Sequence, residues 1–174
     1  KLTVDQGIEQ EVELLVRIPS WVGKTTLRIN DNLVEMLLPE SRPDFQTACG
    51  YNPTLAFYQP IRRRWQSGDA LEIDFELPIL RLRQDQRLPV CGGKVALARG
   101  PLLYFLESID NPGIDLFSAD LRPDSCRAIW EPDLLGGITT IQAETSTGEP
   151  LKFIPYLVWA NRGESLINVF VKQA

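Results

Sequence analysis

The sequence contains no histidine, and this absence excludes several kinds of site at once. Histidine is the commonest general base and the commonest metal ligand in proteins, and Ser-His-Asp and Cys-His catalytic arrangements require it. The carboxylate pairs are therefore the next candidates for acid–base catalysis.

Cysteine is also scarce. The chain has 3 cysteines, Cys49, Cys91 and Cys126, which are widely separated and form no CxxC pair. This spacing is typical neither of a zinc knuckle nor of a dense disulfide framework. We expect each cysteine to be a small buried apolar side chain, and three unpaired thiols favour a reducing, cytoplasmic compartment.

Long apolar runs and an excess of basic charge are missing as well. No run approaches the ~18 to 20 residues of a membrane helix, and no signal-peptide pattern opens the chain. Because the chain starts at Lys1 inside a strand-like segment, we expect it to be an excised or processed piece of a longer protein. The net charge of −5 argues against a nucleic-acid surface, and we interpret the one basic run, Arg62-Arg63-Arg64, as a solvated strand end.

What the sequence does contain is a period of two. Apolar and polar residues alternate over residues 12–18 and 71–77, and Pro19 and Pro78 end these runs, so both are predicted to be half-buried antiparallel strands. Asn30-Asp31-Asn32 predicts a tight hairpin turn. Further strands are expected at residues 25–30, 33–36, 94–99, 102–107, 127–130, 138–142, 153–160 and 166–172, with one helical turn at 115–119.

Short strands separated by Gly, Pro, Asn and Asp are typical of sandwiches. We predict an all-β protein with two small antiparallel β-sandwich (jelly-roll-like) domains in tandem. The expected break lies between Arg83 and Gly93, which gives a first domain of residues 1–88 and a second of residues 89–174. Residues 39–53 are expected to form a long loop of weak pattern, of the kind that is usually functional, mobile or packed on something absent.

Carboxylates offer little chemistry in this arrangement. Glu72, Asp74 and Glu76 share one strand face at about 6.6 Å a step, but a solvated face neither raises a pKa nor excludes water. The loops of the second half are acidic without the close spacing of a calcium loop. We interpret these loop acids as solvated, and they are Asp110, Asp115, Asp120, Asp124, Glu131 and Asp133.

Six segments carry a family resemblance through their order and spacing. They are RIPSW (17–21), WQSGD (65–69), VALARGPLLY (95–104), DNPG (110–113), LLGG (134–137) and IPYLVWANRG (154–163). From about residue 12 to its end, the chain resembles the C-terminal third of family 127 glycoside hydrolases, the β-L-arabinofuranosidase family. The resemblance implies two β-sandwich regions that follow an α-helical catalytic barrel.

The family's chemistry, as this resemblance implies it, uses a zinc-bound cysteine as nucleophile, in a cluster of cysteines and a glutamate on the barrel. Cys91 and Cys126 have no adjacent cysteine and match no part of that cluster. We therefore assign no catalytic and no metal residue, and expect zinc only in the separate catalytic domain. The segment alone is expected not to be an enzyme.

Aromatic residues are the remaining candidates for binding, because Trp and Tyr rings stack on the C–H faces of sugars or fill protein interfaces. Trp21 and Trp65 lie near strand ends and are expected to be half exposed. Trp159 is followed by Asn161 and Arg162, whose polar groups could grip hydroxyls. We interpret these residues as sugar contacts or as domain-interface contacts.

Three functions remain open. The first is a non-catalytic module that packs on and stabilises the helical-barrel domain of its parent glycosidase and offers a surface for a homodimer. The second is an autonomous carbohydrate-binding module, and the third is a carboxylate enzyme centred on Glu72 and Asp74. Of these we favour the first.

Overall fold

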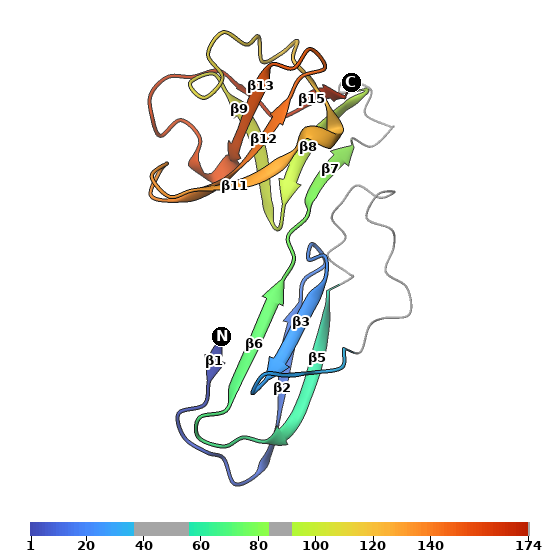
Figure 1. Ribbon diagram of the computed structural model, residues 1–174, viewed down its shortest axis with the longest axis vertical. Helices are drawn as coiled ribbons and strands as arrows, with labels where there is room; N and C mark the ends of the chain where they lie inside the picture. Colours follow the sequence, from blue (N-terminus) through green and yellow to red (C-terminus); the bar gives the residue numbers. More distant parts are fainter. Residues whose placement is uncertain (37–55, 84–91, 174) are drawn as a thin grey trace. The chain divides into compact units, whose positions relative to one another are not determined.

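The computed structural model describes residues 1–36, 56–83 and 92–173 of the 174-residue chain. These residues divide into two compact units, with 1–36 and 56–78 in the first and 79–83 and 92–173 in the second. Strands dominate both units, and the described residues contain no α-helix (Figure 1). The all-β prediction is confirmed. No helix in the described part is long and apolar enough to cross a membrane.

The first unit is built from two antiparallel sheets that share a core. Strands β1 (Leu2–Thr3), β6 (Ala70–Phe75), β3 (Thr25–Ile29) and β4 (Asn32–Leu33) form one sheet in that order. Strands β2 (Glu11–Ile18) and β5 (Phe57–Arg64) form the other. The buried residues come from both sheets, as a sandwich requires, and are Val16, Ile18, Leu27, Ile29, Ile61, Trp65 and Leu71.

The expected hairpin turn is present between β3 and β4. Asn30 and Asp31 have φ of 47° and 67°, the left-handed pair that a two-residue hairpin turn needs. The Asn30 side chain donates to Oδ1 of Asp69 at 2.7 Å and accepts from the amide of Ala70 at 2.9 Å. The turn is thereby tied to the segment that precedes β6.

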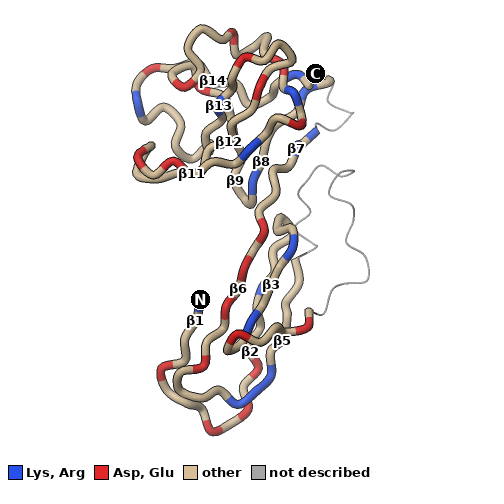
Figure 2. Tube along the Cα trace, in the orientation of Figure 1, with Lys and Arg blue, Asp and Glu red and all other residues tan. Residues whose placement is uncertain are grey.

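The basic run lies within β5 and faces acidic residues of β2. In the antiparallel register Glu11 lies opposite Arg64 and Glu13 lies opposite Arg62, whose guanidinium donates to Glu13 at 2.8 Å (Figure 2). Arg63 instead bonds to Asp69 at 3.0 Å. Opposite charges on paired strands balance this run locally.

The second unit contains one nine-stranded sheet. Its strands are β7 (Ile79–Arg83), β8 (Lys94–Arg99), β9 (Leu102–Glu107), β10 (Asp120–Leu121), β11 (Arg127–Glu131), β12 (Ile138–Glu144), β13 (Pro150–Pro155), β14 (Ile167–Asn168) and β15 (Val171–Gln173). Strand β8 pairs with β7, β9 and β15, and β9 pairs with β8, β13 and β14. Since a strand has only two edges, β15 and β9 share one edge of β8, where they pair with residues 94–95 and 97–99 respectively.

The pairs of this sheet are antiparallel, as predicted, except that β10 runs parallel to β15. Because β7 pairs with β8 along its whole length, residues 79–83 belong to the second unit. The domain boundary expected at residues 88/89 lies outside the described residues, as does the expected long loop at 39–53.

Two expected strands of the second unit end differently. The strand expected at 153–160 stops at Pro155, and a 3-10 turn, η4 (Tyr156–Val158), follows it. The strand expected at 166–172 is interrupted between β14 and β15. A second 3-10 turn, η3 (Pro123–Ser125), precedes β11. Near residue 115, the amide of Ala119 donates to the carbonyl of Asp115 at 3.0 Å, which is the expected helical turn.

Candidate functional site

The loop after η4 is held by a buried ion-pair network. Glu107, at the end of β9, is 1% exposed, and its carboxylate accepts from Nη2 of Arg162 at 2.7 Å. Nη1 of the same guanidinium donates to Asp110 at 2.8 Å. The second oxygen of Glu107 accepts from the amide of Ala160 and the hydroxyl of Ser165. A single carboxylate therefore fixes both ends of this loop.

The network sets the charge states of its members. Burial alone would raise the pKa of Glu107, but hydrogen bonds from Ser165 and Arg162 outweigh it and hold that pKa below its ordinary value. Hydrogen bonding to Asp110 raises the pKa of Arg162. Both side chains are thus charged near neutral pH, and the Arg162 guanidinium is committed to carboxylates within the chain.

The loop and its neighbour present an exposed apolar surface. The rings of Tyr156 and Trp159 stack with centroids 6.3 Å apart and an interplanar angle of 24°, while buried Phe105 contacts Tyr156 edge-on. Trp159 remains 47% exposed. Ser108 donates its amide to the carbonyl of Leu166 at 2.9 Å, so the loop that carries Ile109 lies beside Leu166. We define the apolar patch as the exposed apolar side chains of residues 156–166 and of this loop, namely Ile109, Tyr156, Leu157, Trp159 and Leu166.

The other predicted contact residues have separate environments. Asn161 is exposed beside Arg162. In the first unit Trp21 is half-buried, as expected, and packs edge-on against Phe75 at 6.4 Å. The expectation of a half-exposed Trp65 is wrong, because the ring is 5% exposed and forms part of the first core. Arg63 lies over that ring at 5.1 Å, so a cation covers the face that a surface Trp would offer.

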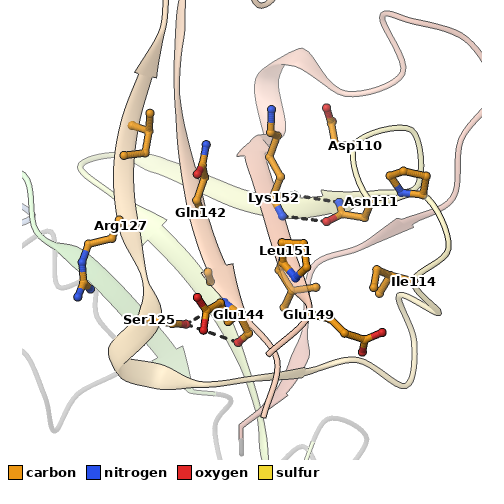
Figure 3. A pocket seen from close by; sticks show the side chains of 14 residues that line it. Asp110, Asn111, Ile114, Ser125, Arg127, Gln142, Glu144, Glu149, Leu151 and Lys152 are labelled. Carbon is orange, nitrogen blue, oxygen red and sulfur yellow. Dashed lines mark hydrogen bonds between the residues drawn. The ribbon is translucent and has the colours of Figure 1, made fainter. Parts of the chain in front are cut away.

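A groove of about 580 Å³ crosses the outer face of β11, β12 and β13 in the second unit (Figure 3). Its walls are the loop that begins at Asp110, the turn before β13, and Ser125 beside β11. Acidic, basic and neutral polar side chains line it, and the chief ones are Asp110, Arg127, Gln142, Glu144, Glu149 and Lys152.

The carboxylates singled out in the sequence are engaged elsewhere. Glu72 pairs with Lys1 at 2.8 Å, and this hydrogen bond lowers its pKa, which is opposite to the need of a general acid. Asp74 pairs with Arg28 at 3.0 Å. In the acidic loops, Asp120 accepts from the amide and hydroxyl of Ser146.

The described residues do not fit a zinc centre. Nowhere in the described ranges do three potential ligands among His, Cys, Asp and Glu come together. Cys126 is half-buried against the second core, and burial raises the pKa of its thiol, whereas a metal thiolate needs the opposite. Cys49 and Cys91 lie outside the described residues.

Two family models together cover nearly all of the chain. The model of the glycoside hydrolase family 127 C-terminal domain matches residues 80–172, and that of the beta-L-arabinofuranosidase GH127 middle domain matches residues 1–79. The chain belongs to glycoside hydrolase family 127. The resemblance carried by its ordered motifs is thereby confirmed, and the two models meet where β7 begins.

Relatives of this GH127 chain are much longer than it is. It is 34% identical, over an alignment 134 residues long, to a non-reducing end beta-L-arabinofuranosidase of Bifidobacterium longum subsp. longum. The match covers 62% of this chain and 20% of that protein. The solved structure of a GH127 beta-L-arabinofuranosidase from Geobacillus stearothermophilus T6 matches with a TM-score of 0.74 and 30% identity, covering 95% of this chain and 27% of that one. A solved GH127 beta-arabinofuranosidase shares the fold, with a TM-score of 0.70 at 24% identity, and is covered to 28%.

Sequence reasoning named Trp159, Asn161 and Arg162 but missed the residues that position them. Glu107 reads as the last residue of an apolar strand, and nothing local indicates that it is buried or that Arg162, 55 residues later, pairs with it. The groove was missed because its lining combines loop residues with residues of three strands, and no local pattern predicts how those strands align. The alternation over residues 141–144 of β12 was the available signal, since it marks Gln142 as outward-facing.

Proposed function

We propose that this chain is the non-catalytic β-sandwich portion of a larger β-L-arabinofuranosidase-like glycoside hydrolase, where it packs on and stabilises a separate helical-barrel catalytic domain. The observation that carries the proposal is the match to middle and C-terminal family domains over residues 1–79 and 80–172, while the relatives are covered only to 20% and 27%. Zinc and the catalytic residues would belong to the remaining length of such a protein.

The apolar patch supports a docking role. Leu157 and Leu166 are 65% and 62% exposed, and several large apolar side chains exposed on neighbouring segments favour an interaction site. The buried pair of Glu107 and Arg162 holds the loop that bears Trp159 in one conformation, which lowers the entropy cost of binding. Aliphatic side chains beside the aromatic pair favour a protein partner over a sugar. We propose that the catalytic domain covers this patch, with a second copy of the protein as the alternative occupant.

The first test is the parent gene. Sequencing upstream of the Lys1 codon should reveal an in-frame helical barrel that carries clustered cysteines and a glutamate. The parent should hydrolyse an aryl β-L-arabinofuranoside, and this chain alone should not. A start codon or an unrelated domain at that place, or hydrolysis by the chain alone, would overturn the proposal.

The second test addresses docking directly. Leu157→Asp in the parent should lower the thermal stability of its activity, because the charge would lie in a buried interface. Leu33→Asp is the matched control, since Leu33 is 73% exposed on the first unit and lies outside the apolar patch. Equal effects of the two substitutions would argue against this docking surface, and ultracentrifugation of both variants would identify a homodimer interface instead.

A further inference from the structure

The groove on the second unit is floored by a row of polar side chains. In the antiparallel register Arg127 of β11 lies opposite Gln142 of β12, which lies opposite Lys152 of β13 (Figure 3). Directly paired residues project to the same face of a sheet, and neighbouring strands lie about 4.8 Å apart. The backbone positions of the row therefore span roughly 10 Å, and from one face of the sheet the row extends side chains that end in a guanidinium, an amide and an ammonium group.

One wall of the groove is fixed by a buried asparagine. Asn111 is 3% exposed, and its Nδ2 donates to the carbonyls of Glu107 at 2.8 Å and of Lys152 at 2.9 Å. Its Oδ1 accepts from the amide of Lys152 at 2.8 Å. The carboxamide thus replaces a strand partner just beyond the β9–β13 ladder and ties the wall loop to the sheet.

The opposite wall is also held in place. The Ser125 hydroxyl accepts from the amide of Glu144 at 2.9 Å and donates to the carbonyl of Arg122 at 2.6 Å. Nη1 of Arg127 donates to the carbonyls of Asp124 and Cys126, which fixes the guanidinium against the segment that precedes β11. Because these walls are already ordered before binding, the groove loses little conformational entropy when a ligand binds.

The charges of the groove are mixed and locally balanced. Asp110 is paired with Arg162, Glu144 with Arg122, and Lys152 with Glu131 at 3.0 Å. Such a lining offers hydrogen-bond donors and acceptors side by side, without an excess of positive or negative charge. A polyanion would meet the carboxylates, and an apolar ligand would leave these groups without partners. A neutral ligand with many hydroxyls, each of which can donate and accept, satisfies both kinds of group.

Apolar surface completes the lining. Ile129 is 40% exposed on the same face as Arg127, and Pro112 and Pro150 lie on the rim. A sugar ring likewise has C–H faces beside its hydroxyl edge. The volume of about 580 Å³ lies within the usual range for small-ligand sites. We propose that this groove binds a short neutral oligosaccharide, with hydroxyls on the Arg127–Gln142–Lys152 row and C–H faces over Ile129.

The direct test is calorimetry on the full chain with arabinotriose and xylotriose as neutral probes and trigalacturonic acid as the charged one. At least one neutral probe should bind with a Kd of about 1 mM, and Gln142→Ala should weaken it about tenfold. Ile129→Trp should block the groove and abolish binding. Gln66→Ala, an exposed glutamine of the first unit, is the matched control and should leave the affinity unchanged.

Trp159→Ala decides between the groove and the aromatic pair as the sugar surface. Full affinity in this variant, with loss in Gln142→Ala and Ile129→Trp, supports the groove. Loss in Trp159→Ala with retention in the groove variants overturns it, as does tighter binding of trigalacturonic acid or no binding of either neutral probe. Because the assay uses this chain alone, its failure is distinct from failure of the docking proposal, which concerns a catalytic partner.

Discussion

Glu107 and Arg162 form an ion pair in which the carboxylate is 1% exposed and the guanidinium donates to it at 2.7 Å from a loop 55 residues away. The pair joins the end of β9 to the loop that carries Trp159. A buried carboxylate is stable only while its partners remain, so this contact couples the order of an exposed surface to the stability of the unit beneath it.

Removal of the Arg162 guanidinium should therefore be costly. In Arg162→Met the Glu107 carboxylate would stay buried without its cation, and we expect the free energy of unfolding to fall by about 3 kcal/mol. Urea unfolding followed by circular dichroism measures this change. The matched control is Arg28→Met, which breaks an exposed pair with Asp74 and should cost less than about 1 kcal/mol. Equal losses would show that the Glu107 site is effectively solvated.

Acid should act through the same carboxylate. The pKa of Glu107 is lowered in the folded chain, so the contribution of Glu107 to stability is present above its unfolded pKa of about 4.3 and is lost as pH falls through the folded value. The stability of the wild type should thus decline more steeply below about pH 4.3 than that of Glu107→Gln. Melting temperatures of both proteins from neutral to acidic pH would measure the difference, and parallel curves would contradict it.

Trp65 and Trp159 should differ in how much each stabilises the fold. Trp65→Ala opens a cavity in the first core and should cost about 3 to 5 kcal/mol, whereas Trp159→Ala removes a half-exposed ring and should cost about 1 kcal/mol or less. Chemical denaturation of both variants measures the contrast. A large loss of unfolding free energy in Trp159→Ala would mean that the stack of Trp159 on Tyr156 stabilises the fold, and would argue against its role as a surface for a binding partner.

The parts of the fold that could be predicted are those governed by local patterns. Residues 94–99 and 102–107 form β8 and β9 as expected, because the break at Gly100-Pro101 interrupts an otherwise extended apolar run. The hairpin turn at Asn30 was also predictable from a local pattern, because asparagine and aspartate are among the few residues that accept a positive φ.

The parts that could not be predicted depend on distant partners. Residues 156–160 have the composition of a strand, yet the chain turns at Tyr156 and Ala160 takes a φ of 54°. The amide of Ala160 bonds to the Glu107 carboxylate instead of to a neighbouring strand. The polar row of the groove likewise exists only through the register of β11, β12 and β13, which no local pattern specifies.

The hairpin turn offers a gain in stability. Asp31 has a φ of 67°, a conformation that costs an L-residue free energy and glycine almost none, so Asp31→Gly should raise the free energy of unfolding by up to about 1 kcal/mol. Asn30→Gly is the control and should be destabilising, because the Asn30 side chain bonds to Asp69 and Ala70. Thermal unfolding distinguishes them, and a stabilising Asn30→Gly would contradict the assigned role of that side chain.

Asn111 should matter to stability and to the groove together. Asn111→Ala leaves the carbonyl of Glu107 and both backbone groups of Lys152 without this partner, and we expect a loss of about 3 kcal/mol in the free energy of unfolding. Asn168→Ala is the matched control, since its amide makes a single bond, to the carbonyl of Leu116, and its removal should cost about 1 kcal/mol.

Asn111→Ala also tests whether the wall loop of the groove contributes to ligand binding. If Asn111 positions the wall loop, then Asn111→Ala measured at a temperature where it remains folded should bind the neutral trisaccharide more weakly than wild type, although the row of Arg127, Gln142 and Lys152 is unchanged. Asn168→Ala should bind normally. Unchanged affinity in folded Asn111→Ala would show that the sheet face alone forms the binding surface, because the wall would then contribute neither contacts nor preorganisation.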